Sequence, residues 1–423
     1  MRSGNLKLVL SAGVCAAMAT PSLAQYQATI INPAGYTEAF CEGAGGGKQV
    51  GFGRLGVGFN THALLWTGTS ASFVDLNPDG YDGSVAYGSG GNQQVGVGFD
   101  LGIDRAMLWT GTAESFVDMS PADTTGSFAY ATDGTRQVGH ALAPFTGFGP
   151  RAYTWTGTAE SAVSLHSFDY DDTTAYDVDN GRIAGTATAF DAFYNAVLWT
   201  SPSADSIVSL HRPELFDETV ASAIRGTTIG GNGNGASTGG PNHAIIWLNL
   251  GETVVDLHPG PDYFTSFIFA MSNTQQVGLA SIGDGSEEHA CVWSGSSASF
   301  IDLHSLIPGG PYESSRATSI DSDGSIYGNA RIGGDYFAVR WTPVTTPASC
   351  LADVASDSSD TTRNSNGSIG PEDIEAFVNG FIADSAAIAD VASDSSDTAF
   401  NPNGAVGPED LEAFVNSFVA GGC

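Results

Sequence analysis

The sequence predicts a mainly β protein, a seven-bladed β-propeller followed by a small α-helical module, and three observations lead to this prediction. The chain has 423 residues and seven tryptophans, which recur at intervals of 43, 46, 44, 48, 46 and 48 residues. Each tryptophan has the same place in a repeat rich in β-branched and aromatic residues. After Cys350 the tryptophans stop, and a second repeat begins with a period of 37 residues. A period of about 40–50 residues with strand-like segments is typical of propeller blades.

Residues 1–24 have the pattern of a secretory signal peptide. Arg2 and Lys7 form its basic start, residues 8–18 its apolar stretch, and residues 22–24 a small-residue cleavage site before Gln25. The apolar stretch is too short to span a bilayer. We therefore expect an exported protein, secreted or extracellular and without a membrane span, with attachment to the cell surface left open.

Residues 25–343 contain seven units, each of which divides into four short strand-like runs. The second unit reads SVAYGSGGNQQVGVGF, DLGID and RAMLWTGTAESFVDM, so its runs are S-x-A-Y, Q-Q-V-G-x-G, A-x-L-W and S-F-V-D-L. The turns before Gln93 and after most of the tryptophans are short and rich in glycine, as tight hairpins are. We therefore expect four antiparallel strands per unit, which together make one blade.

The seventh unit lacks its fourth run, because after Trp341 the chain continues into the proline-containing stretch 343–347. The missing run is found at the start of the mature chain, where residues 28–36 align with residues 72–81. The sequence therefore predicts that an N-terminal strand closes the last blade. Such closure removes exposed strand edges, which otherwise invite aggregation.

Three of the third runs read HALLW, HAIIW and HACVW, and each precedes a V-D-L or I-D-L run. These pieces resemble the extracellular HAF-type repeat. The resemblance implies the repeat fold and secretion, and it carries no catalytic residues to this chain. The sequence departs from the pattern where other residues replace the histidine, at Arg105, Arg151, Asn195 and Phe337.

Histidine and aspartate recur at fixed repeat positions. The histidines that begin the third run are His62, His243 and His289, and those that follow the fourth run are His166, His211, His258 and His304. A ring of histidines could bind a transition metal, but duplication of a structural position is the favoured interpretation. The aspartates of the V-D-L runs, at 75, 118, 256 and 302, are expected to cap turns. Cys41 and Cys291 fall in different blades and are expected to be buried, free and structural.

Residues 344–349 form a linker, and residues 350–423 form a second module that contains two copies of one sequence, 352–383 and 389–420. Apolar residues near the end of each copy follow the i, i+3, i+4, i+7 spacing of an amphipathic helix. Pro371 and Pro408 suit the first turn of these helices. The helix residues expected to bind a partner are Ile374, Phe377, Val378, Phe381, Leu411, Phe414, Val415 and Phe418.

Before each helix the pattern N-x-N-G-x-x-x-x-x-D resembles an EF-hand-like calcium loop. Oxygen-bearing side chains alternate, a glycine permits a sharp turn, and a carboxylate closes the loop. We therefore expect two calcium ions, and the alternative is an acidic solvated loop without metal. The candidate ligands are Asp353, Asp357, Asp360, Asn364, Asn366, Ser368 and Asp373 in the first copy, and Asp390, Asp394, Asp397, Asn401, Asn403 and Asp410 in the second.

This module resembles a dockerin of the type that begins near a cysteine and ends in Gly-Cys. The resemblance implies a calcium-dependent module that docks onto a cohesin domain. The sequence departs from it at Thr362 and Ala399, where an opening Asp is expected. Asp353 and Asp390 are favoured as the opening ligands, because each has the opening Ala-Asp place of the dockerin repeat. Cys350 and Cys423 bracket the module and are expected to form a disulfide, which export permits, although Cys423 could instead attach another molecule.

Loops between the second and third runs vary in length and carry aromatic residues. Variable loops on a rigid scaffold are where binding function often resides. Aromatic rings suit sugar rings, and the alternative is that these residues pack against neighbouring loops. The candidate ligand-face residues are Phe145, Phe148, Phe190, Phe193 and Tyr194.

The net charge and the absence of certain catalytic motifs exclude some classes of function. The formal net charge of -32 argues against nucleic acid and anionic lipid as partners, and it suits cation binding or simple solubility. The chain has no H-E-x-x-H or phosphate-loop motif. We therefore expect a secreted docking protein whose propeller binds or displays an extracellular ligand, and whose C-terminal module anchors it to a cohesin or cell-surface partner. The alternatives are a tethered glycosidase or lyase acting on polysaccharide, and a structural surface protein without a small ligand.

Overall fold

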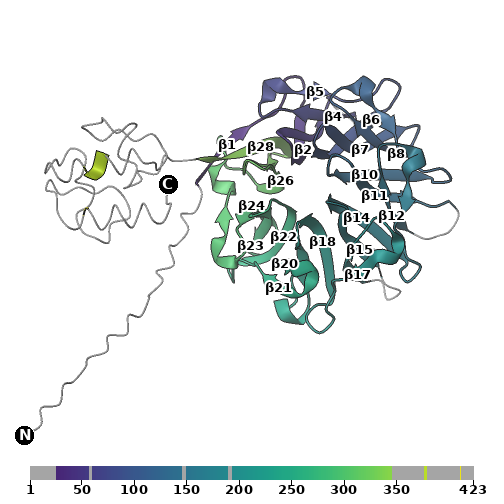
Figure 1. Ribbon diagram of the computed structural model, residues 1–423. Helices are drawn as coiled ribbons and strands as arrows, with labels where there is room; N and C mark the ends of the chain where they lie inside the picture. The colour runs from purple at the N-terminus through teal and green to yellow at the C-terminus, as the bar shows by residue number, and fades with distance from the viewer. Residues whose placement is uncertain are drawn as a thin grey trace, which may run out of the picture.

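A computed structural model describes residues 25–56, 60–144, 149–188, 193–344, 376–378 and 410. Within these residues, seven four-stranded antiparallel sheets surround a central axis as the blades of a propeller (Figure 1). The predicted seven-bladed propeller, with one tryptophan in each blade, is therefore confirmed. No helix among the described residues is both long enough and apolar enough to cross a bilayer.

In six of the seven blades, the four strands follow one another in the sequence. The strands nearest the axis are β2 (Glu38–Gly45), β6 (Gly83–Gly90), β10 (Gly126–Thr132), β14 (Asp172–Asp179), β18 (Glu218–Arg225), β22 (Tyr263–Met271) and β26 (Ser314–Ile320). The second strands are β3 (Lys48–Arg54), β7 (Gln93–Asp100), β11 (Gln137–Leu142), β15 (Arg182–Thr188), β19 (Thr228–Asn234), β23 (Gln276–Ile282) and β27 (Ile326–Ile332). The third strands are β4 (Thr61–Trp66), β8 (Ile103–Trp109), β12 (Pro150–Trp155), β16 (Tyr194–Trp199), β20 (His243–Leu248), β24 (Glu287–Trp293) and β28 (Asp335–Val344). The outer strands are β5 (Val74–Asp75), β9 (Val117–Asp118), β13 (Val163–Ser164), β17 (Ile207–Ser209), β21 (Thr253–Asp256), β25 (Ile301–Asp302) and, in the last blade, β1 (Gln25–Ile30).

Strand β1 closes the ring as the sequence predicts. It pairs with β28 in antiparallel register, with Ala28 opposite Trp341. Just after β1, the N–H of Ile31 donates to the carbonyl oxygen of Ala338 at 2.9 Å, as Leu76 does to Ala63 at 2.8 Å in the first blade. Because residues 25–30 complete the last blade, the two ends of the propeller sequence hold each other in place.

The tryptophans fill the spaces between blades. All seven side chains are fully buried, at or near the ends of the third strands. Trp109, for example, packs with Val50, Leu65 and Leu76 of the preceding blade. The indole N–H groups of Trp199, Trp247 and Trp341 donate to carbonyl oxygens of the preceding blade, those of Leu165, Leu210 and Leu303, at 2.9, 3.1 and 2.9 Å. Each tryptophan thus joins its blade to the one before it.

The outer strands are shorter than the S-F-V-D-L run predicts. In the first blade the hydroxyl of Ser72 accepts from the N–H of Thr67 at 2.9 Å and donates to the carbonyl oxygen of Thr69 at 2.7 Å, which holds the serine in a turn rather than a strand. Only Val74 and Asp75 then pair with β4. The short 3₁₀ helices of the chain are η1 (Ser70–Ser72), η2 (Ala113–Ser115), η3 (Ala159–Ser161), η4 (Ala204–Ser206), η5 (Ala236–Thr238), η6 (Asn249–Gly251), η7 (Ser297–Ser299) and η8 (His304–Leu306).

A buried glutamine from the second strand supports the same turn. The side-chain oxygen of Gln49 accepts from the N–H of Gly68 at 2.6 Å, and Gln137 and Gln276 do the same for Gly157 and Gly295. The three glycines have φ angles of 91°, 97° and 83°, a backbone conformation that glycine adopts without steric cost. This explains the glycine at the second position after the tryptophan in these three blades.

Of the C-terminal module the structure describes four residues. Residues 376–378 and Asp410 have helical backbone. The side chains of Phe377 and Asp410 are buried, and Val378 is 42% exposed. The other candidate calcium ligands from Asp353 to Asn403, the other predicted helix residues, and the expected Cys350–Cys423 disulfide lie outside the described residues.

Candidate functional site

Each of the seven innermost strands contains a β-bulge at the same repeat position. In each strand the pairing with the second strand skips one residue, which is left without a partner across the sheet. We call these residues the bulge ring, and all of them are half-buried around the axis. They are Glu42, Tyr87, Tyr130, Tyr176, Ser222, Phe269 and Thr318.

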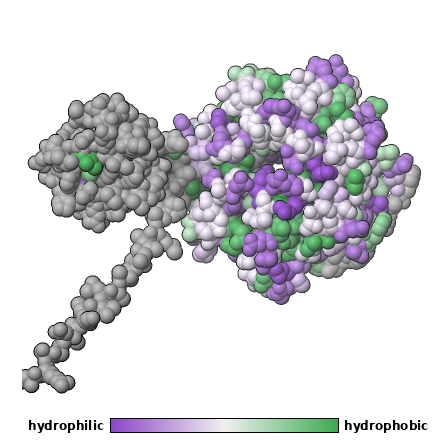
Figure 2. Space-filling model, in the orientation of Figure 1, coloured by the Kyte–Doolittle hydropathy of each residue, from purple (hydrophilic) through white to green (hydrophobic). Residues whose placement is uncertain are grey.

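The bulge ring lines an axial cavity of about 650 Å³. Phe40, Phe52, Arg331 and Tyr336 also line it, and they stand at strand ends beside the loops that join second to third strands. Ser89, at the opposite end of its strand, lines the cavity as well, so the cavity runs along the axis. Its volume is within the range of about 300–1,000 Å³ that is usual for small-molecule sites. Figure 2 shows the surface hollowed near the middle of the propeller, with hydrophilic residues around the hollow.

Small residues after the bulge allow neighbouring inner strands to approach each other. A Cβ atom on Gly43 would overlap the carbonyl oxygen of Tyr87, and one on Gly88 would lie 2.6 Å from that of Tyr130. Larger residues at these two positions would therefore push the blades apart. The close approach keeps the bulge residues of adjacent blades together around the cavity.

Three tyrosines of consecutive blades form one wall of the cavity. The ring centroids of Tyr87 and Tyr130 are 5.4 Å apart, and those of Tyr130 and Tyr176 are 5.8 Å apart. His140 packs behind Tyr130, and burial lowers the pKa of this histidine to about 4, so it is neutral at neutral pH. Burial and the nearby Glu42 raise the pKa of Tyr87 to about 12. The Tyr87 phenol therefore keeps its proton, and the wall is an aromatic surface that carries hydroxyl groups.

The cavity also contains an acid–base cluster made by Glu42, Glu288 and Arg316. The Arg316 guanidinium donates from Nε and Nη2 to the Glu288 carboxylate, at 2.6 and 2.8 Å. Glu42 receives one long hydrogen bond, from the side-chain nitrogen of Asn329 at 3.4 Å. Burial raises the pKa of Glu42 to about 7, against the opposing effects of Asn329 and the Arg316 charge. A carboxyl group with such a pKa can carry or give up a proton near neutrality.

A second ion pair lies elsewhere in the lining. Nη1 of Arg225 donates to the Asp177 carboxylate at 2.7 Å, and the N–H of Ile224 donates to the same oxygen at 2.8 Å. Burial raises the pKa of Asp177, although Arg225 and the Ile224 N–H oppose that rise. The pair is therefore neutral overall and holds β14 to β18.

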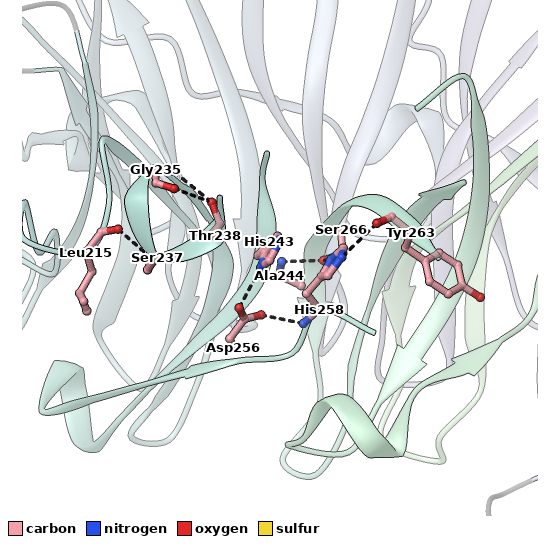
Figure 3. A network of polar contacts seen from close by, with 10 residues as sticks. All are labelled: Leu215, Gly235, Ser237, Thr238, His243, Ala244, Asp256, His258, Tyr263 and Ser266. Carbon is pink, nitrogen blue, oxygen red and sulfur yellow. Dashed lines mark hydrogen bonds and ion pairs between the residues drawn. The ribbon is translucent and has the colours of Figure 1, made fainter. Parts of the chain in front are cut away.

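Histidines that follow the outer strands link one blade to the next. In the fifth blade, Nδ1 of His258 lies 2.9 Å from the hydroxyl of Ser266, which belongs to the sixth blade and also accepts from the N–H of Ala244 (Figure 3). His166, His211 and His304 contact Thr173, Thr219 and Ser315 in the same way, at 3.0, 3.0 and 2.8 Å. This repeated link is structural and accounts for the recurrence of these four histidines.

Aspartates of the V-D-L runs cap turns, as the sequence predicts, and also hold the other histidines. One oxygen of Asp256 accepts from the N–H of His258, and the other lies 2.8 Å from Nδ1 of His243 (Figure 3). The rings of His243 and His258 stack at 3.9 Å. His62–Asp75 and His289–Asp302 repeat the ion-pair geometry at 2.7 and 2.6 Å. Within the described ranges, no group of three or more His, Cys, Asp or Glu side chains is placed to hold a metal ion.

Those of the remaining candidate residues that the structure describes lie outside the axial cavity. Cys41 and Cys291 are buried and free, which confirms that prediction. Phe193 and Tyr194 are 48% and 52% exposed at the start of β16, and neither lines the axial cavity. Phe145, Phe148 and Phe190 lie outside the described residues.

Sequence reasoning missed the bulge ring. One signal was available, because the S-x-A-Y run places Tyr87, Tyr130 and Tyr176 at one repeat position. The other four blades have Glu, Ser, Phe or Thr there. A β-bulge does not require a particular residue type, so strand alternation gave no indication that this position turns toward the axis.

Comparisons with known proteins bear on the fold. No protein-family model matches the sequence, and no curated protein matches it. Among solved structures, a puromycin hydrolase is similar with a TM-score of 0.50 and 13% identity, over 72% of this chain and 51% of that one. A puromycin-hydrolyzing peptidase of Mycobacterium tuberculosis has a TM-score of 0.49 at 14% identity, over 75% and 53%. The propeller domain of the trilobed protease of Pyrococcus furiosus has a TM-score of 0.45 at 10% identity, over 72% and 95%. The chain thus spans about half the length of the first two proteins, and at these identities the similarity shows the fold alone.

Proposed function

We propose that this is an exported binding protein whose axial cavity holds a saccharide. The observation that carries the proposal is the bulge ring, which sets a wall of three tyrosines beside hydrogen-bonding side chains in one cavity. A sugar ring has apolar C–H faces that pack on aromatic rings, and hydroxyl groups that require polar partners. Aromatic walls with a few convergent polar groups are characteristic of binding sites for small ligands.

Binding of the full chain to an array of glycans tests this proposal. Binding of a defined class of saccharide, lost when Tyr130 is replaced by alanine, would support it. If no saccharide binds, or if Tyr130→Ala binds as the wild type does, the axial cavity is not a saccharide site.

We further propose that the C-terminal module anchors the propeller to a cohesin or cell-surface partner and requires calcium for its fold. Support comes from the duplicated Asn-x-Asn-Gly pattern and from helix spacing in both copies. Metal binding and folding are coupled in modules of this kind. A chelator should therefore reduce the helical circular dichroism signal of the full chain while the propeller keeps its unfolding temperature. A helical signal unchanged by the chelator would contradict the calcium assignment.

A carbohydrate-active enzyme is the second candidate, and Glu42 is the observation that favours it. Its pKa of about 7 is suited to a general acid that acts near neutral pH. A screen for cleavage of extracellular polysaccharides separates this candidate from simple binding. Turnover that is abolished in Glu42→Gln, while saccharide binding is retained, would identify an enzyme, whereas binding without turnover supports the first proposal.

A further inference from the structure

The charges of the axial cavity leave one carboxylate without a cation. Arg316 engages Glu288 through two hydrogen bonds, and Arg225 engages Asp177. Arg331, the remaining arginine of the lining, lies over the Tyr336 ring and 3.7 Å from the carboxylate of Glu313. Among the described residues Glu42 has no salt bridge, because the Arg316 guanidinium turns its donors to Glu288 and acts on Glu42 only at longer range. A half-buried carboxylate that lacks a paired cation can receive one from a ligand in the cavity.

The aromatic wall lies beside this carboxylate. Glu42 and Tyr87 belong to adjacent blades, and the charge of Glu42 is one cause of the raised pKa of Tyr87. Tyr130 and Tyr176 extend the wall away from Glu42, with centroid spacings of 5.4 and 5.8 Å along it. The faces of aromatic rings attract ammonium groups electrostatically, and several rings near one carboxylate are the usual chemistry of an organic-cation site.

The charge of the whole chain favours the same kind of ligand. With 46 acidic and 14 basic residues, the protein attracts cations over its surface. A neutral sugar would gain nothing from this field, and an acidic sugar would be repelled by it. A sugar that carries a protonated amine would be attracted and would also complete the pairing of Glu42.

We propose that the axial cavity recognises saccharides bearing a protonated amine, with the ammonium group held between the Glu42 carboxylate and the tyrosine wall. This inference rests on the proposed saccharide-binding function. It adds the chemical class of the ligand, an amino sugar whose nitrogen is not acylated. The sugar rings would lie along Tyr130 and Tyr176, and the amine would displace water from Glu42.

Isothermal titration of the full chain with two matched probes tests the inference. The probes are a tetramer of glucosamine and the N-acetylated tetramer of the same length, both at pH 6.5. We expect the amine probe to bind at least tenfold more tightly. Glu42→Gln should remove this difference while its unfolding midpoint shows that it is folded. Glu160→Gln, which removes an exposed carboxylate from η3, should leave the difference unchanged.

Choline serves as a third probe, because it carries the cation without a sugar. If both tetramers bind equally, the amine inference is overturned and the saccharide site stands. If choline binds in a Glu42-dependent way but no saccharide binds, the cation site stands and the proposed saccharide function falls. If none of the three probes binds, or if Glu42→Gln keeps the full preference for the amine, the inference is wrong.

Discussion

At the scale of single residues, the axial cavity contains the half-buried acidic side chain of Glu42. Glu42 has its ordinary pKa of 4.5 in the unfolded chain and about 7 in the folded protein. Folding therefore favours the protonated form. The protein is most stable, as far as this group is concerned, below pH 4.5, and it loses stability as the pH rises from 4.5 through 7.

The first prediction follows from the direction of this change of stability with pH. Replacing Glu42 by glutamine should raise the free energy of unfolding at pH 8 by up to about 3 kcal/mol, since each pKa unit corresponds to about 1.4 kcal/mol. At pH 4 the two proteins should unfold alike, because both carry a neutral side chain. Urea unfolding of the full chain at the two pH values measures this difference, with Glu160→Gln as the control. Equal stability of wild type and Glu42→Gln at pH 8 would show that the carboxylate is adequately paired or solvated.

The second prediction concerns the hydroxyl that links neighbouring blades. Ser266 satisfies the N–H of Ala244 and contacts His258, so Ser266→Ala leaves a buried donor without a partner. The expected loss is about 1–3 kcal/mol. Ser266→Thr should retain most of the stability, because the chain itself uses Thr173 and Thr219 at the equivalent position. Thermal unfolding of the two variants checks this, and an equal loss in both would mean that packing around Ser266, rather than its hydroxyl, holds the blades.

At the scale of strands, the ring depends on β1. This strand supplies the outer edge of the last blade and leads into the fully buried Ile31. Deleting residues 25–31 should cost at least about 4 kcal/mol, given the loss of a buried isoleucine and of the pairing with β28, and should promote aggregation through the exposed edge. Light scattering and thermal unfolding measure both effects, and a peptide of residues 25–36 added in trans should partly reverse them. A truncated protein that stays monomeric and equally stable would show that β1 does not close the ring.

Strands also show what the sequence can and cannot predict. The blade count and the closing strand were predictable because a rare, bulky residue marks every unit and because residues 28–36 repeat the pattern of an outer strand. The length of the outer strands was not, since Ser72 and its equivalents form turns through side-chain hydrogen bonds. The surroundings of Glu42 were also beyond prediction, because Asn329, which donates to its carboxylate, comes from the opposite end of the propeller sequence.

At the scale of the whole molecule, the propeller offers two distinct places for a ligand. One is the axial cavity, built from rigid inner strands of all seven blades. The other is the rim of variable loops, where the sequence placed its candidate aromatic residues and where Tyr194 is exposed. A rigid site on strands positions its groups more accurately than a loop does. We therefore propose that the ligand binds at the axis.

The measurement that tests this assignment most directly compares one residue from each place. The saccharide with the strongest signal on the glycan array is titrated calorimetrically into the full-length wild type, Tyr130→Ala and Tyr194→Ala, with unfolding midpoints recorded for all three. We predict that Tyr130→Ala weakens binding at least tenfold, consistent with about 1.4 kcal/mol or more lost per aromatic contact, while Tyr194→Ala binds as the wild type does. Unchanged affinity in Tyr130→Ala together with weakened affinity in Tyr194→Ala would place the site on the loops and contradict the account.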